Sequence, residues 1–429
     1  MTTVGKRRLG RRLQRAEFSR IAGIGVIVQL LTVVSGPLVA RMLGPSGRGV
    51  LVIVMVVATI GAQLGSASLS AAIAHTVAHS RGSARDVFGG DFRWWLLWST
   101  VPSAFAGLAT ALLLHDAHWW PVLVGEAFTV TLFACWLNIL AGMLQGEGAV
   151  PRINFLRVMF SSTYVLSVIA IFLIHRTDLA AVVLFTYVFA QLVGLYLSWT
   201  GLQRGTGDRA AHAARASVHA FARRAFVSSI GALDSLGLDQ LLVGVLLTQS
   251  ALGLYAVAIS MTTLPAMALG GIAATLLPKM AARSRNEAAL VMRRWLRAAV
   301  AVDLALVLGL ELVVGPALRI FFGSDFVPAT GCARILIVAR ALLAMRMILA
   351  AAAQAQGRGG ATSAVELGSS LVLLVGVTIG VQVGGIEGAA VALLVTAVVS
   401  CASLVSLISW RPVDLTERDP HSAGMRRFS

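Results

Sequence analysis

Two arginines, Arg340 and Arg346, stand inside an apolar stretch that runs from about residue 331 to 353. A charged side chain at the centre of a bilayer costs at least about 2.5–3.5 kcal/mol, so a charge in such a stretch is a candidate for function. Guanidinium groups match the oxygens of phosphate and pyrophosphate. The sequence leaves three interpretations open: the wall of an anion-binding cavity, a pair with a carboxylate on a neighbouring helix, or an arginine that reaches to the surface.

The spacing of these two arginines limits how they could act together. On a straight helix they are about 9 Å apart along the axis and about 240° apart around it, so they do not share one face. Arg41 and Arg48, on either side of a turn rich in glycine and proline, are two further candidates for the same cationic cavity.

Carboxylates also occur in apolar segments. Asp234 and Asp239 are five residues apart within one of them, and Asp303 lies in another. A desolvated carboxyl group could carry a coupling proton, and one surrounded by oxygen ligands could carry sodium. The alternative is a structural partner for a buried arginine, with Asp239 and Arg340 as one such pair. We expect no other cofactor and no metal site.

The chain carries none of the motifs HExxH, GxSxG or GxxxxGK[ST], and no GxGxxG follows a predicted strand. The loops between apolar runs reach about 25 residues, whereas a small folded domain needs about 40 or more. We therefore predict that the chain is not an enzyme. The net charge of +16 does not indicate nucleic acid, because the basic residues lie between hydrophobic runs.

The elements that position these residues follow from composition. Hydrophobic residues make up 57% of the chain and charged residues 13%, against about 45–50% and about 25% in soluble domains. Runs of about 20 apolar residues recur, each long enough to cross a bilayer as a helix, and predict an all-α polytopic membrane protein of about 12 spans. The predicted spans are 21–42, 50–74, 94–114, 121–144, 153–174, 179–200, 225–247, 251–278, 297–316, 331–353, 361–382 and 387–410.

Charge supports this topology. With both termini on one side, the segments on that side hold 28 of the 35 lysines and arginines, and the opposite loops hold five. Since cytoplasmic loops are enriched in Lys and Arg, both termini are expected to be cytoplasmic. The expected location is a bacterial inner membrane. Tryptophans near predicted span ends, such as Trp94, Trp120 and Trp199, agree with these boundaries.

A shift of 204 residues aligns the chain with itself and indicates an internal repeat. Leu43, Ser46 and Gly49 then match Leu247, Ser250 and Gly253. Six spans per half make the two repeats parallel, and transporters built in this way often bind substrate between the halves. The expected organisation is a basic N-terminus at 1–20, an N-terminal lobe at 21–203, a cytoplasmic connector at 204–224, a C-terminal lobe at 225–410 and a cytoplasmic tail at 411–429.

The turn after the first span carries a resemblance to a known family. The segment from Leu38 to Gly49, LVARMLGPSGRG, resembles the LGPxGRG-type signature of bacterial polysaccharide flippases of the O-antigen translocase type. The stretches LGLDQLLVG at 236–244, ALGLYAVA at 251–258 and QAQG at 354–357 look like later parts of the same family, with Asp239 on its recurrent acidic position. These flippases belong to the multidrug/oligosaccharidyl-lipid/polysaccharide exporter superfamily.

The resemblance implies two six-helix lobes in a V shape, alternating access, and export of an undecaprenyl-pyrophosphate-linked oligosaccharide with coupling to an ion gradient. It also implies membrane lipids, and glycosyltransferases or a polymerase of a glycan gene cluster, as partners. Two alternatives stay open at this point. One is a multidrug or cation antiporter of the same superfamily, which two buried arginines disfavour because like charges repel. The other is a membrane scaffold for glycan assembly that transports nothing.

Overall fold

The computed structural model describes residues 3–80, 84–85, 92–117, 119–174, 180–202, 218, 221–222, 237–266, 268–269, 285–356 and 358–408. All regular elements in these ranges are helical. Asp234, most of the predicted connector and the predicted tail lie outside the described residues. The basic N-terminal segment belongs to the first helix, which begins at Thr3.

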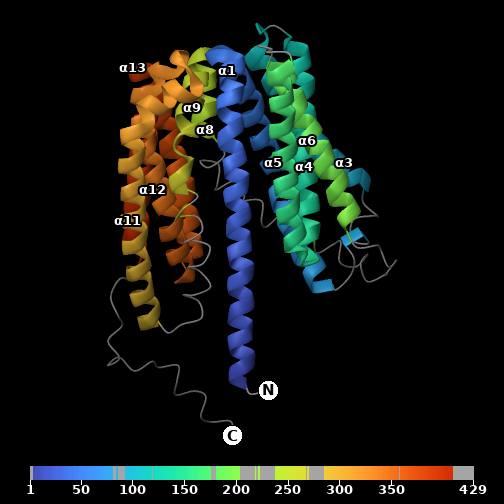
Figure 1. Ribbon diagram of the computed structural model, residues 1–429, viewed down its shortest axis with the longest axis vertical. Helices are drawn as coiled ribbons and strands as arrows, with labels where there is room; N and C mark the ends of the chain where they lie inside the picture. Colours follow the sequence, from blue (N-terminus) through green and yellow to red (C-terminus); the bar gives the residue numbers. More distant parts are fainter. Residues whose placement is uncertain are drawn as a thin grey trace.

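The N-terminal half contains five helices in the described ranges, and the first of them turns back on itself. Helix α1 bends at Gly44, where φ is +62° and ψ is −177°, and Pro45 follows. The ribbon of α1 rises from the N-terminus to this bend, and its second arm packs along α4 (Figure 1). The helices are α1 (Thr3–Ser80), α3 (Phe92–Leu114), α4 (Trp120–Gly146), α5 (Val150–Ile174) and α6 (Ala180–Gly201).

The C-terminal half repeats this pattern in the ranges that the structure describes. Its first two helices meet at an extended Leu247, and the hydroxyl of Thr248 accepts a hydrogen bond from the backbone N–H of Ala251. Its last helix bends at Gly384 and Gly385. The elements are α8 (Leu238–Leu246), α9 (Gln249–Ser260), α11 (Arg285–Ala317), η2 (Leu318–Phe322), η3 (Ser324–Ala329), α12 (Thr330–Ala355) and α13 (Gly359–Leu407).

These elements account for the predicted twelve spans in two sets of six. Eight helices are long and apolar enough to cross a membrane, and two of them, α1 and α13, consist of two arms each. The short helices α8 and α9 lie within the two remaining predicted spans, 225–247 and 251–278. The separate helices predicted at 21–42 and 50–74 are the two arms of α1, which meet at Gly44, because a glycine with positive φ turns the chain without a longer loop.

The bends of the two halves contact each other at one end of the molecule, which we call the kink end (residues 44–49 and 247–253). A Cβ added to Gly49 would overlap the carbonyl oxygen of Gln249, and one added to Gly253 would overlap that of Pro45. Under the 204-residue shift Pro45 matches Gln249, and Gly49 matches Gly253. The contact is therefore reciprocal, as at a two-fold interface, and it agrees with the predicted repeat.

Buried hydrophobic side chains form one core at the kink end and two at the opposite end, where α1 begins. The kink-end core joins residues of both halves, such as Val54 and Leu123 with Tyr255 and Leu336. At the opposite end, one core belongs to the first half and its connector, and a separate core belongs to the second half. Among the residues that the structure describes, the halves therefore share a hydrophobic core only at the kink end.

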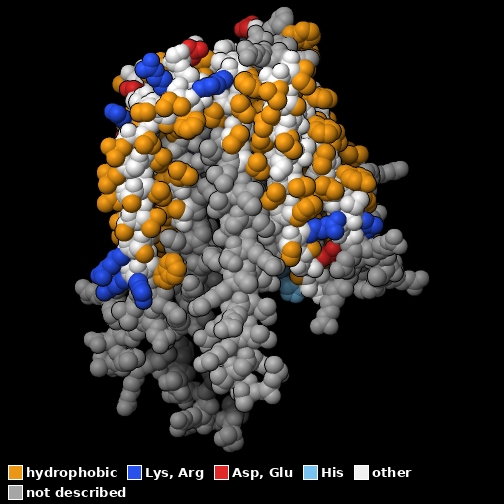
Figure 2. Space-filling view, viewed as in Figure 1, with side chains coloured by type: hydrophobic (Ala, Val, Ile, Leu, Met, Phe, Trp, Pro, Cys, Tyr) orange, Lys and Arg blue, Asp and Glu red, His pale blue; other side chains and the backbone are white. Residues whose placement is uncertain are grey.

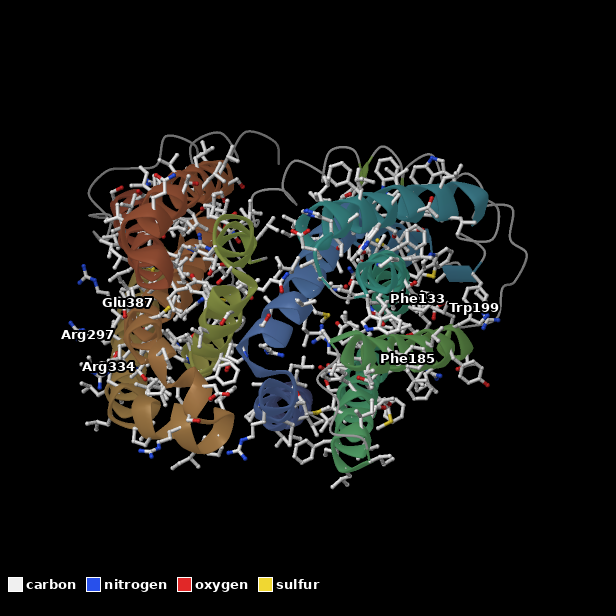
Figure 3. The ribbon with its side chains drawn as sticks, turned by 90° about the horizontal axis from the view of Figure 1, so that it is seen from above. Phe133, Phe185, Trp199, Arg297, Arg334 and Glu387 are labelled. Atoms are coloured by element: carbon white, nitrogen blue, oxygen red, sulfur yellow. The ribbon has the colours of Figure 1, made fainter. Side chains whose placement is uncertain are left out.

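The outer surface is apolar, as a lipid environment requires. Figure 2 shows exposed hydrophobic side chains over the middle of the described helices and arginines mainly near their ends. Two tryptophans at the kink end, Trp119 and Trp120, are 53% and 41% exposed, and Trp199 near the opposite end is 45% exposed. Seen from above, the helices form two groups, with Arg297 and Arg334 at the outer edge of one and Phe185 and Trp199 on the other (Figure 3).

Candidate functional site

A polar cavity of about 360 Å³ lies where the two halves meet, below the kink end. Both arms of α1 line it, together with α5 and α6, and the second half contributes Gln240 of α8 and Ser260 of α9. Ser35, Ser161, Tyr164 and Tyr187 add hydroxyl groups. The remaining lining is apolar and includes residues Gly36, Val39, Leu51, Val52, Met55, Val56, Phe160 and Val165.

Arg48 is the one charged side chain among the described residues that line this cavity. It is half-buried, and its Nε has no hydrogen-bond partner. No described carboxylate lies within ion-pair distance of it. A buried cation without a counter-ion is costly, so the cavity favours a ligand that brings negative charge. The guanidinium can donate two parallel hydrogen bonds to a phosphate group.

The tight turn explains how Arg48 reaches the cavity. Gly44 takes a backbone conformation that side chains with a Cβ rarely adopt, and Pro45 begins the second arm of α1. Gly49 lets this arm approach Gln249 closely. Arg48 therefore lies on the first turn of the second arm, beside the contact between the halves.

Aromatic rings form one wall of the cavity. The rings of Tyr164 and Tyr187 meet edge to face with centroids 5.5 Å apart, and Phe160 meets Tyr187 in the same way at 5.3 Å. Tyrosine presents an apolar ring and a hydroxyl that can bond to sugar or phosphate oxygens. No motif in the sequence marks these tyrosines as site residues. The one feature that could have indicated them is the rarity of tyrosine, since the chain has four tyrosines and two of them line the cavity.

Arg340 and Asp239 form an ion pair in the second half. The Asp239 Oδ2 atom lies 3.1 Å from Arg340 Nη2 and accepts a hydrogen bond from the Tyr255 hydroxyl at 3.0 Å. The Asp239 side chain is fully buried and that of Arg340 is 22% exposed. These contacts join α8, α9 and α12. The structure therefore has the pair that the sequence left open as an alternative to a cavity wall.

Arg346 lies in a different environment from Arg340, as their angular separation on the helix predicts. Arg346 and Asp303 are both within electrostatic reach of Cys401, so they mark a second polar cluster between α11, α12 and α13. Asp303 is 7% exposed, and its Oδ1 has no hydrogen-bond partner. None of these residues is among those that line the Arg48 cavity.

Arg41 of the first half forms a hydrogen bond to the second half near the kink end. Its side chain is exposed, and Nη2 donates a hydrogen bond to the backbone oxygen of Ile320 in η2. Ser46 contributes another link, since its hydroxyl lies 3.5 Å from the side-chain oxygen of Gln249. Of the four predicted cavity arginines, the structure thus brings Arg48 to a cavity and gives Arg41 and Arg340 protein partners.

The two-lobed helical fold and its apolar spans define a multi-pass helical membrane protein with a cavity between its halves. The model of the polysaccharide biosynthesis protein family matches residues 38–330, and the chain belongs to this family. No curated protein matches the chain.

Solved structures share the fold. The chain is similar to "Lipid II flippase MurJ, inward closed conformation", with a TM-score of 0.71 and 12% identity over 90% of this chain and 86% of that one. It is also similar to "Inward-facing conformation of a multidrug resistance MATE family transporter of the MOP superfamily", with a TM-score of 0.67 and 15% identity over 90% and 97%. The chain is also similar to the outward-facing conformation of a multidrug resistance MATE family transporter, with a TM-score of 0.54 and 16% identity over 91% of this chain and 94% of that one.

Proposed function

We propose that this chain moves a lipid-linked oligosaccharide with a pyrophosphate head group across a bacterial inner membrane for the synthesis of a surface polysaccharide. The observation that carries the proposal is the half-buried Arg48, which has no carboxylate partner among the described residues and lines a cavity between the two halves. A pyrophosphate supplies the missing negative charge, and the nearby hydroxyl and amide groups suit the first sugar. Membership of the polysaccharide biosynthesis family supports the same class of substrate.

Alternating access is the mechanism that the arrangement of cores supports. If the termini are cytoplasmic, as the loop charges favour, the shared core closes the side away from the cytoplasm. The separate cores then let the halves move apart on the cytoplasmic side, where the lipid-linked sugar is made. The substrate would bind from that side, and separation of the reciprocal kink contact would release it on the other.

Ion coupling is a further part of the proposal. Of the candidate carboxylates, Asp239 already pairs with Arg340, and Asp234 lies outside the described residues. Asp303 is buried and has an unpartnered Oδ1, so we assign it the role of binding a proton or sodium ion.

A deletion strain tests the proposed substrate. Without the protein, the lipid-linked oligosaccharide should accumulate in the cytoplasmic leaflet, and the surface glycan should be lost. Wild-type protein should restore the glycan, Arg48→Lys should restore part of it, and Arg48→Gln should fail at an equal protein level. Arg157→Gln is the matched control, since Arg157 is exposed on α5 and is not among the cavity residues.

The alternative function is that of a multidrug or cation antiporter, since the chain is similar to multidrug resistance MATE family transporters. An arginine as the one charge among the described cavity residues disfavours it, because a cationic ligand would be repelled. A deletion strain with normal surface glycan and raised drug sensitivity would favour the drug exporter and overturn the proposal.

A further inference from the structure

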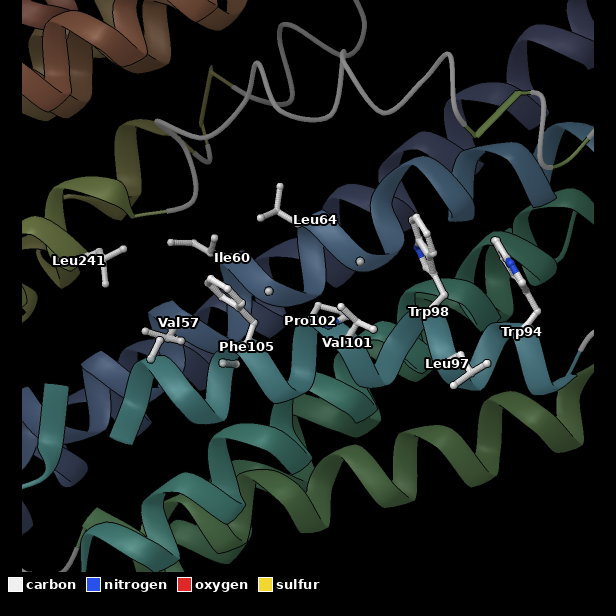
Figure 4. A pocket seen from close by; sticks show the side chains of 14 residues that line it. Val57, Ile60, Leu64, Trp94, Leu97, Trp98, Val101, Pro102, Phe105 and Leu241 are labelled. Atoms are coloured by element: carbon white, nitrogen blue, oxygen red, sulfur yellow. The ribbon is translucent and has the colours of Figure 1, made fainter. Parts of the chain in front are cut away.

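An apolar groove of about 640 Å³ runs between the second arm of α1 and α3. Figure 4 shows Leu241 of α8 at one end and Trp94 at the other, with the line of α3 side chains between them. All the described lining residues are apolar types, and the indole N–H groups of Trp94 and Trp98 are the polar atoms that their side chains offer. The groove is therefore suited to hydrocarbon and not to a sugar or a charged group.

The groove is open along the lipid-facing side of α3. Leu97, Val101 and Phe105 succeed one another at intervals of four residues and are 66%, 69% and 72% exposed. Residues four apart lie along one face of a helix, so these side chains form a continuous stripe. An extended chain could enter such a groove sideways from the bilayer without leaving a hydrocarbon environment.

The groove and the Arg48 cavity use neighbouring positions on the same two helices. On α1, Val56 lines the cavity and Val57 lines the groove, and on α8 the corresponding neighbours are Gln240 and Leu241. A polar cavity with one cation thus lies beside a wholly apolar groove. This pairing matches a ligand with an anionic head and an apolar tail.

We propose that the groove holds the first isoprene units of the substrate's polyprenyl tail while its pyrophosphate occupies the Arg48 cavity. The inference rests on the proposed function and extends it by assigning a site to the tail. A single groove accepts one hydrocarbon chain. A polyprenyl lipid has one such chain, whereas a phospholipid has two. The remainder of the tail stays in the bilayer as the head group crosses.

A series of pyrophosphate lipids of increasing chain length tests the groove. Geranyl, farnesyl and undecaprenyl pyrophosphate would be titrated into nanodiscs of phosphatidylethanolamine and phosphatidylglycerol, with affinity expressed per mole fraction of lipid to cancel partitioning. The test variant is Val101→Trp, which fills the groove. Leu108→Trp is the control, since Leu108 is 57% exposed on the same helix but is not a groove residue.

For wild type and Leu108→Trp we expect affinity to rise at least about tenfold along the series, or about 1.4 kcal/mol. Val101→Trp should lose most of this rise, with an unchanged melting temperature. An equal rise in Val101→Trp, with the membrane phospholipids present throughout, would overturn the tail site. Failure of the proposed function has a different signature, namely wild-type binding that is absent or insensitive to Arg48→Gln.

Discussion

The ion pair between Arg340 and Asp239 determines what a substitution at either position should do. Breaking a buried pair costs about 3–5 kcal/mol, whereas replacing both partners by apolar residues is often nearly neutral. We expect Arg340→Ala to lower the melting temperature of the purified protein, because it leaves the fully buried Asp239 without its cation. Arg340→Met combined with Asp239→Leu should recover much of this stability.

The matched control for this double-mutant cycle is Arg157→Ala, which removes an exposed arginine from α5. If Arg340→Ala were as stable as this control and lost only transport, a substrate-binding role for Arg340 would be favoured over a structural one. The sequence alone predicts loss of transport at a normal protein level for Arg340→Ala.

At this scale the sequence predicts residue types better than partners. Charged residues stand out inside or directly beside apolar segments, so Arg340, Asp239 and Arg48 are all predictable as candidates. Which of them would pair could not be derived, because it depends on how helices about a hundred residues apart are rotated against each other. Arg48 looked like part of a polar turn, but the kink places it beside Tyr164 in the cavity wall.

At the scale of elements, the reciprocal contact of the two bends makes a specific prediction. A methyl group at Gly49 or Gly253 would clash with a backbone oxygen of the other half, so the bends must separate. We expect Gly49→Ala and Gly253→Ala each to destabilise the closed kink end. The measurement is faster labelling of a cysteine introduced at Ser46 by a membrane-impermeant maleimide, after the three native cysteines are replaced.

Gly309→Ala is the control for this labelling, because a Cβ at Gly309 meets nothing within 4 Å. It should label at the wild-type rate and be slightly stabilised, by about 0.5–1 kcal/mol, since alanine favours a helix interior. Wild-type labelling rates in Gly49→Ala and Gly253→Ala would contradict the proposed role of the contact.

Helices and bends were the most predictable level of this structure. In the described ranges, the ends of the predicted spans lie within a few residues of the ends of a helix or helix arm. The exceptions are helix starts such as Thr3 and Arg285, where the helix extends into charged sequence. A glycine followed by a proline, as at Gly44 and Pro45, predicts a turn. The direction of the second arm could not be predicted, since it depends on packing against other helices such as α9.

For the whole molecule, the shared core at the kink end predicts that the halves must separate there during transport. A disulfide between Ser46→Cys and Gln249→Cys, whose side chains meet in the native protein, should abolish transport and leave head-group binding intact. The control is Ser66→Cys with Asn138→Cys, a native contact of 2.9 Å within one half. Normal transport with the first disulfide formed would contradict alternating access.

The most direct test of the proposed function is the rate at which undecaprenyl-pyrophosphate-linked sugar crosses the bilayer of proteoliposomes that contain the purified protein. Hydrogen bonds to charged groups contribute about 1.5–3 kcal/mol each, so Arg48→Gln should slow the crossing by about tenfold or more. With the Arg157→Gln variant, the lipid-linked sugar should cross at the wild-type rate. Crossing that is no faster with the wild-type protein than in empty liposomes, or that is equally fast with Arg48→Gln, would contradict the account.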